Sequence, residues 1–176
     1  SILKSKPSHL VYNFNPNSVL SFEYSPMCYW VPNDILKMIL ESNQLVNTAD
    51  SRSGLITGNA PRFLRLFWEV GDIVNYYPAA NGGGYKRWTG LENWLVKWDS
   101  NSKEIIREIG AFRSSEYYSK NGWAATQAAQ GSLGVRINNA TFTGNCIGIY
   151  PKNDYDVLDL GFSLNSPLST YILRIS

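Results

Sequence analysis

The segment Gly54–Val70 reads Gly-Leu-Ile-Thr-Gly-Asn-Ala-Pro-Arg-Phe-Leu-Arg-Leu-Phe-Trp-Glu-Val, a polar loop followed by an apolar run. Gly54 and Gly58 permit positive φ values and close approach of another backbone, as a tight loop requires. A loop that is joined to a buried segment is held in place, which a recognition loop needs. We therefore predict that residues 63–70 lie in the core and that the loop faces a ligand. Arg65, inside the apolar run, is expected to face a structural carboxylate.

The composition predicts one folded domain spanning residues 1–176. The chain is 44% hydrophobic and 17% charged, as ordered globular proteins are, and it is long enough to bury a core. Two cysteines and one histidine give no disulfide framework and no histidine-based metal site or catalytic triad. No apolar run approaches a membrane span and no signal peptide is visible, so we expect a cytoplasmic protein without a membrane partner. Because the chain starts with Ser and stops inside an apolar segment, we expect a piece of something longer.

Periodic patterns predict an α+β fold with a twisted, mostly antiparallel sheet and helices near both ends. Apolar residues at helical spacing follow Pro32 and Asn101, and helical patterns also start at Asp154 and Pro167. Residues 92–99 alternate, which is typical of a half-buried strand with one side in the core. A short helix over 16–22 and further strands over 73–77, 117–126, 134–138 and 141–149 complete the prediction.

Four groups of residues, in order along the chain, carry a resemblance to a known family. They are Ser25-Pro26-Met27-Cys28-Tyr29-Trp30; Gly54, Thr57, Gly58 and Arg62-Phe63-Leu64-Arg65 with Trp68-Glu69-Val70; Gly82-Gly83-Gly84 with Trp88; and Leu164-Asn165-Ser166. The chain resembles the C-terminal target-recognition region of adenine-specific DNA methyltransferases, of the PglX type in BREX phage defence and of type IIG restriction-modification. The resemblance implies a domain that binds double-stranded DNA. It also implies that a catalytic domain of the same polypeptide binds S-adenosylmethionine and flips the target adenine.

The catalytic motifs of such enzymes are absent from this chain, so we expect it to be non-catalytic alone and to bind no cofactor. Residues 15–18 start like the family's Asn-Pro-Pro-Tyr motif but read Asn-Pro-Asn-Ser. The triple glycine at 82–84 neither follows a strand directly nor opens a helix, so it is a poor phosphate loop. We interpret the clustered carboxylates as structural and not as catalytic acids or bases. Glu104 and Glu108 are expected to pair with cations on the same helix face. Asp154, Asp156 and Asp159 lie at the start of a predicted helix, where the helix dipole favours acidic side chains.

The positive charge is concentrated in the middle of the chain. Residues 52–136 hold eleven Lys/Arg against seven Asp/Glu, whereas the net charge of the whole chain is +2. Arginine reads guanine and Asn or Gln reads adenine, while cations and hydroxyls bind phosphate. We predict DNA contacts at three places, namely Thr57, Asn59 and Arg62; Lys86 and Arg87; and Gln127, Gln130 and Arg136.

Other interpretations of these residues remain open at the level of sequence. The polar loops are also compatible with solvated surfaces on which arginines stack on aromatic neighbours. A carbohydrate-binding module is the alternative function, because Trp88, Trp94, Trp98 and Trp123 accompany Asn- and Gly-rich loops. A stand-alone enzyme would need converging titratable groups, and the sequence offers no such set.

Overall fold

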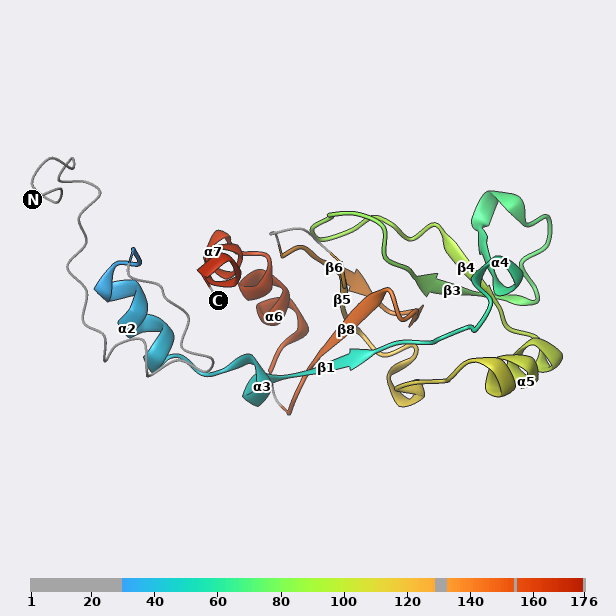
Figure 1. Ribbon diagram of the computed structural model, residues 1–176, viewed down its shortest axis with the longest axis horizontal. Helices are drawn as coiled ribbons and strands as arrows, with labels where there is room; N and C mark the ends of the chain where they lie inside the picture. Colours follow the sequence, from blue (N-terminus) through green and yellow to red (C-terminus); the bar gives the residue numbers. More distant parts are fainter. Residues whose placement is uncertain (1–29, 129–132, 154, 176) are drawn as a thin grey trace, which may run out of the picture. The chain divides into compact units, whose positions relative to one another are not determined.

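The computed structural model describes residues 30–128, 133–153 and 155–175 (Figure 1). The chain divides into two compact units, one of residues 44–173 and one that contains α2 (Asn33–Glu41) and the end of the chain from Arg174. The expected helix over 16–22 lies outside the described residues. The single-domain organisation predicted for residues 1–176 stays a prediction.

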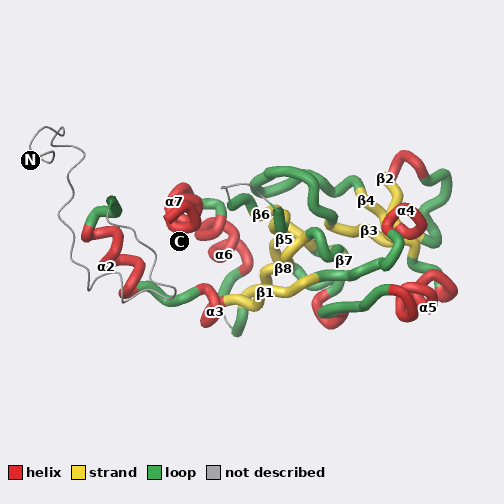
Figure 2. The backbone as a smooth tube through the Cα atoms, viewed as in Figure 1, coloured by secondary structure: helices red, strands yellow, loops and turns green. Residues whose placement is uncertain are grey.

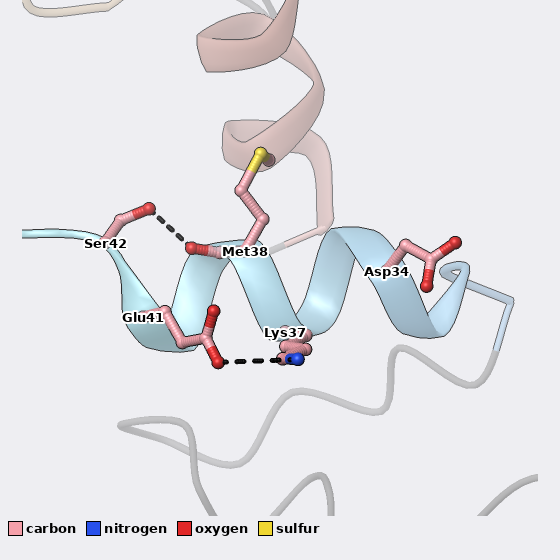
Figure 3. A pocket seen from close by; sticks show the side chains of 5 residues that line it. All are labelled: Asp34, Lys37, Met38, Glu41 and Ser42. Carbon is pink, nitrogen blue, oxygen red and sulfur yellow. Dashed lines mark hydrogen bonds and ion pairs between the residues drawn. The ribbon is translucent and has the colours of Figure 1, made fainter.

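Helix α2 begins where the sequence predicted, directly after Pro32. The backbone N–H groups of Ile35 and Leu36 donate to the Pro32 carbonyl, and Leu36 is the buried residue of the helix. A surface hollow of about 400 Å³ lies along α2, and Figure 3 shows the side chains that line it, namely Asp34, Lys37, Met38, Glu41 and Ser42. Lys37 and Glu41 pair with each other across one helical turn, at 3.8 Å, and both side chains are exposed. We assign no ligand to this hollow.

The first sheet of the 44–173 unit is fully antiparallel, with the order β1-β8-β5-β6. Its strands are β1 (Ala49–Ser53), β8 (Cys146–Pro151), β5 (Gly122–Thr126) and β6 (Val135–Asn138). Helix α6 (Val157–Leu164) buries Leu160 and Leu164 against this sheet, and the Trp123 indole N–H donates to the Val157 carbonyl at 2.6 Å. Asp156 accepts hydrogen bonds from the first turn of α6, as a helix cap does. Helix α7 (Pro167–Ile175) follows.

The second sheet has the order β2-β4-β3-β7 and is antiparallel except for the pair β3–β7. Its strands are β2 (Leu64–Leu66), β4 (Trp94–Lys97), β3 (Tyr76–Ala80) and β7 (Thr141–Phe142). Short helix α4 (Ala60–Phe63) and helix α5 (Ser100–Ile109) adjoin it, and Figure 2 shows them at the end of the unit opposite to α6. The core here is formed by Leu55, Phe63, Leu64, Ala79, Val96 and Ile106. The remaining short elements are α3 (Leu45–Thr48), η3 (Phe67–Glu69) and η4 (Ser115–Tyr117).

Leu55 connects the two sheets by pairing with the end of β7 and with the turn that follows it. The Leu55 N–H donates to the Phe142 carbonyl at 2.7 Å, and the Gly144 N–H donates to the Leu55 carbonyl at 2.8 Å. Phe142 is fully buried and packs edge-on against Tyr118. The two sheets therefore share one continuous junction, which fixes the Gly54 loop against the β7–β8 turn.

The α+β class with mostly antiparallel strands is confirmed, and so are the helices predicted from Pro32, Asn101, Asp154 and Pro167. The prediction that residues 63–70 are buried throughout is wrong. Phe63 is 1% exposed, but Phe67 is 53% and Trp68 60% exposed. The reason is that β2 ends after three residues, where the Glu69 carboxylate accepts the Leu66 N–H at 2.8 Å and turns the chain outward.

Three strand boundaries also differ from the prediction. Strand β3 starts at Tyr76 and continues through Pro78 to Ala80. Proline, which has no backbone N–H, is tolerated there because β7 pairs only with Ala79 and Ala80. Tyr117 ends a 3-10 helix and residues 118–121 form a turn and a bend, so β5 starts at Gly122 and is shorter than predicted. The strand expected over 141–149 is two strands separated by the turn 143–145.

Tyr150→Phe should make the stability of the protein fall less steeply as the pH rises into the alkaline range. Tyr150 is 3% exposed, and burial raises its pKa to about 12, with the nearby Asn138 amide offsetting this only partly. Because the folded pKa exceeds the ordinary value of 10.0, the stabilisation is complete below pH 10 and is lost as the pH rises towards 12. We expect the urea midpoint of the variant to fall less between pH 9 and about 11 than that of the wild type. Tyr155→Phe is the control, since that side chain is 48% exposed, and an equal flattening there would contradict the assignment.

Candidate functional site

A cleft of about 450 Å³ lies where the Gly54 loop meets the β7–β8 turn. We call it the polar cleft, and it is lined by Ser53, Leu55, Ile56, Thr57, Gly58, Ala60, Leu64, Arg113, Gln127, Thr143, Gly144 and Asn145. Arg113 is exposed, and within the described part of the chain its guanidinium makes no hydrogen bond or ion pair. No carboxylate is among the described residues that line the cleft. The cleft therefore combines an apolar floor, amide side chains and one uncompensated cation.

Glycine is required at both ends of the loop that forms one wall of the polar cleft. A Cβ on Gly54 would lie 2.1 Å from the Phe142 carbonyl oxygen, so only glycine lets the two backbones pair there. Gly58 has φ +71°, and a Cβ on it would lie 2.3 Å from the Ile109 carbonyl oxygen. Between them, Ile56 exchanges backbone hydrogen bonds of 2.9 and 2.8 Å with Ala111. The loop is thus held by backbone contacts on both sides, and Thr57 is only 7% exposed in the wall.

The predicted contacts Asn59, which precedes α4, and Arg62, which lies within it, are close in the chain to Ala60 of the polar cleft. The Asn59 side chain accepts the Arg62 N–H at 3.1 Å and so caps the helix, which explains the choice of Asn structurally. The Arg62 guanidinium is exposed and lies over the Phe63 ring at 5.3 Å. Arg65 does not face a carboxylate as expected; it donates to the backbone carbonyls of Pro61 and Leu64. Arg62 is therefore available at the surface, whereas Arg65 stabilises the α4–β2 connection.

Arg136 is 1% exposed, so the prediction that it contacts DNA is corrected. One terminal nitrogen donates to the Asn81 carbonyl at 2.8 Å and to Cys146 Sγ at 3.1 Å, and the other lies 3.4 Å from Thr126 Oγ1. Burial raises the pKa of the Cys146 thiol, so the neutral sulfur accepts this hydrogen bond. Its neighbours in β6 are Val135, which is 0% exposed, and Ile137, which is 46% exposed, so the burial of Arg136 follows from the distant segments that its guanidinium contacts and not from the strand's own pattern.

The second wall of the polar cleft is built on the Asn81 side chain. Asn81 Oδ1 accepts from Thr143 Oγ1 at 2.6 Å and from Asn145 Nδ2 at 3.1 Å. The Gln127 backbone N–H donates to the Asn145 carbonyl at 3.0 Å. Gln127 and Asn145, which are both exposed, are thus joined through their backbones, and we call these two residues the rim of the cleft.

Lys86 and Arg87 lie elsewhere in the 44–173 unit and do not line the polar cleft. Arg87 is half-buried, donates to Thr170 Oγ1 of α7 at 3.3 Å and lies over the Tyr85 ring at 5.5 Å. Lys86 is exposed. Figure 1 shows α7 and α4 at opposite ends of this unit, so the cations predicted to act together form two groups.

The structure therefore brings Thr57 and Gln127 together in one cleft, with Asn59 and Arg62 close in the chain to its lining, and separates Lys86 and Arg87 from them. Gln130 lies outside the described residues. Arg113 was not predicted as a site residue, because it follows α5 in a loop and no local motif distinguishes it from other surface arginines. Asn145 was missed because the turn at 143–145 was read as part of a strand; the dipeptide Gly144-Asn145 was the available turn signal.

The tryptophans of the carbohydrate-binding alternative do not form an exposed platform. Trp123 is 3% exposed, and Trp94 and Trp98 pack against the core of the second sheet. Trp88 is 40% exposed but packs against Trp123 and Phe162, with ring centroids at 6.1 and 5.1 Å. That alternative is unsupported.

Another group of charges is satisfied within the fold. Asp50 accepts from the Tyr117 hydroxyl at 2.8 Å and pairs with Arg52 at 3.0 Å and Lys152 at 3.6 Å. The Tyr117 hydrogen bond is the main cause that lowers the pKa of Asp50. Across the described ranges, no group of His, Cys, Asp and Glu side chains is arranged to hold a metal ion, and no helix is long and apolar enough to cross a bilayer.

The fold and the site define an α+β protein with a cationic cleft that amide side chains line. We also compared the sequence of the chain with those of known proteins. No family model matches the chain. The chain is 23% identical, over 190 aligned residues, to the adenine-specific methyltransferase PglX of Lacticaseibacillus casei (strain Zhang). The alignment covers 94% of this chain and 16% of that protein, so the chain spans about a sixth of the length of its relative. The similarity is distant, and it is a similarity to one part of that longer protein.

Proposed function

We propose that this chain is a target-recognition domain, which binds double-stranded DNA and presents it to the catalytic domain of an adenine-specific methyltransferase. The observation that carries the proposal is the polar cleft, in which an uncompensated Arg113 lies with the Gln127 and Asn145 amides and without a carboxylate. The distant similarity to PglX across nearly the whole chain supports the same assignment. Methyl transfer from S-adenosylmethionine belongs, in this proposal, to another part of a longer cytoplasmic polypeptide of phage defence or restriction-modification.

The cations and the amides have different tasks in this proposal. Arg113 and the exposed Arg62 neutralise phosphates, which gives affinity and orientation without sequence information. The amides on the rim contact base edges, where Gln and Asn pair well with adenine. Lys86 contributes a further phosphate contact where a bound duplex extends past the cleft. Thr57 and Asn59 hold the wall and the helix that position these groups.

Replacing Arg113 should weaken DNA binding for all sequences and reduce its salt dependence. We expect wild-type binding to a mixed-sequence duplex to weaken steeply as salt is raised, because phosphate contacts release counterions. In Arg113→Gln, the slope of log affinity against log salt should fall by about one, since one phosphate contact is lost. Fluorescence anisotropy of a labelled duplex between 50 and about 200 mM salt measures this slope.

Lys152→Gln is the matched control, because it also removes one positive charge, but from a side chain that pairs with Asp50 at 3.6 Å outside the cleft. Its slope should equal that of the wild type. Absence of DNA binding at low salt, or binding that salt does not affect, would contradict the proposed function. An equal change of slope in both variants would contradict the assignment of Arg113.

A further inference from the structure

We propose that Asn145 is a base-reading side chain of the polar cleft and that the buried Arg136 is the positioning residue that holds it. The inference rests on the proposed function, because base reading presupposes DNA in the cleft. It assigns a specificity role to the turn between β7 and β8.

Asn145 has an exposed side chain, and the residue is held by one hydrogen bond of that side chain and by three contacts of its backbone. Its Nδ2 donates to Asn81 Oδ1 at 3.1 Å, its carbonyl accepts the Gln127 N–H at 3.0 Å, and its N–H donates to Thr143 Oγ1 at 3.3 Å. Gly82 packs against the same carbonyl, since a Cβ there would lie 2.7 Å from the oxygen. A polar side chain that is immobilised at the rim of a cleft is preorganised for a directional contact.

Arg136 connects the three chain segments on which that geometry depends. Its planar guanidinium reaches Asn81 on the segment after β3, Cys146 at the start of β8 and Thr126 at the end of β5. Thr126 Oγ1 in turn donates to the Gly84 carbonyl at 2.8 Å. Burying a cation is costly unless its donors are satisfied, and only arginine offers several N–H donors in one rigid fork. The arrangement therefore holds the Asn81 backbone, and through its side chain Asn145.

The hydrogen-bonding groups of the rim determine which base the cleft can recognise. Gln127 and Asn145 each present an amide with a donor and an acceptor, and no described carboxylate lines the cleft beside them. An amide pairs with the adenine N6 donor and N7 acceptor in the major groove, whereas a guanine edge offers acceptors only. We therefore infer that this rim reads at least one A·T pair.

Asn145→Ala should change the sequence that the 176-residue chain selects, without changing its salt dependence. Selection from a randomised duplex pool should give a wild-type preference that includes adenine, and the variant should lose that preference at one position by about tenfold. The salt slope should stay as in the wild type, because no cation is removed. Asn101→Ala is the control, since that exposed asparagine lies on α5 outside the lining of the cleft, and it should select the wild-type sequence.

Arg136→Lys tests the positioning role, because lysine keeps the charge but cannot reach the same three acceptors. The Arg136→Lys variant should lose its sequence preference at the same base position as Asn145→Ala. In the double variant that carries both substitutions, the preference at this position should fall no further than in either single variant. Asn81→Ala provides a second route if Arg136→Lys unfolds, since it removes the side-chain bonds to Thr143 and Asn145 and should have the same effect on selection.

The outcomes separate this inference from the function on which it rests. If the wild type binds no DNA, the proposed function fails and the inference with it. If the wild type selects a sequence and Asn145→Ala selects the same one, the inference alone is wrong. If the wild type binds every sequence equally, target recognition and the inference both fail, and only the DNA-binding part of the proposed function stands. If Asn145→Ala loses the base preference at one position but Arg136→Lys and Asn81→Ala keep that preference, the positioning role proposed for Arg136 is wrong.

Discussion

Phe63→Ala should lower the free energy of unfolding by about 3–5 kcal/mol, a large share of the stability of a domain of this size. Phe63 is 1% exposed and belongs to the core of the second sheet with Leu55, Leu64, Val96 and Ile106. Truncation removes the transfer free energy of the ring and leaves a cavity that the surrounding core residues fill only in part. Urea denaturation followed by tryptophan fluorescence measures the difference.

Phe67→Ala is the matched control for that substitution, because the same residue type occurs four positions further along the same segment. Phe67 is 53% exposed and contacts Trp68 edge-on, with ring centroids at 4.8 Å. We expect its loss to cost below about 1 kcal/mol, since most of its surface is already hydrated. Equal destabilisation by the two variants would contradict the described position of the chain after Leu66.

Gly54→Ala is expected to destabilise the protein by about 1–3 kcal/mol or more, although it adds a single methyl group. The added carbon would lie 2.1 Å from the Phe142 carbonyl oxygen and 2.6 Å from its ring. Because the first of these atoms is backbone, relief requires the Gly54 loop to separate from the β7–β8 turn. The same movement opens one wall of the polar cleft, so DNA affinity should fall together with stability.

The comparison is Gly71→Ala, for which no atom lies within 4 Å of the added carbon. Its free energy of unfolding should stay within about 0.5 kcal/mol of the wild type. Thermal unfolding monitored by circular dichroism compares the two variants directly. A Gly54→Ala protein as stable as Gly71→Ala would show that the two sheets are not joined at Phe142 as described.

Local signals predicted the helices and part of the core well. In α5, Ile106 follows from helical spacing and is fully buried, and Asp99 caps the helix by accepting the Ser102 N–H at 2.9 Å. The alternation over residues 92–99 predicted a strand with one side in the core, and in β4 the side chains of Trp94 and Val96 form that side. The outward turn at Phe67 was not predictable in the same way, because the apolar run continues through the residues that leave the sheet.

The candidate site was predicted only in part, because its geometry depends on contacts between distant segments. Gly54 and Gly58 indicated a tight loop, and the loop is tight. Nothing local distinguishes Arg136 from a surface arginine, since its acceptors come from Asn81, Thr126 and Cys146. These distant contacts, and not the pattern of β6, decide that its guanidinium is buried. Arg113 follows α5 and Gln127 follows β5, and only the tertiary fold brings the two residues together in the lining of the polar cleft.

The pairing of β1 with β8 has a consequence for synthesis of the protein. Ala49 lies opposite Pro151, and Ser53 lies opposite Ile147. A ribosome must therefore add about a hundred residues after β1 before that strand finds its partner, which at ordinary elongation rates takes several seconds. During this interval the backbone amides of β1 stay open to other chains, and chaperones that shield nascent strands should raise the yield of native protein.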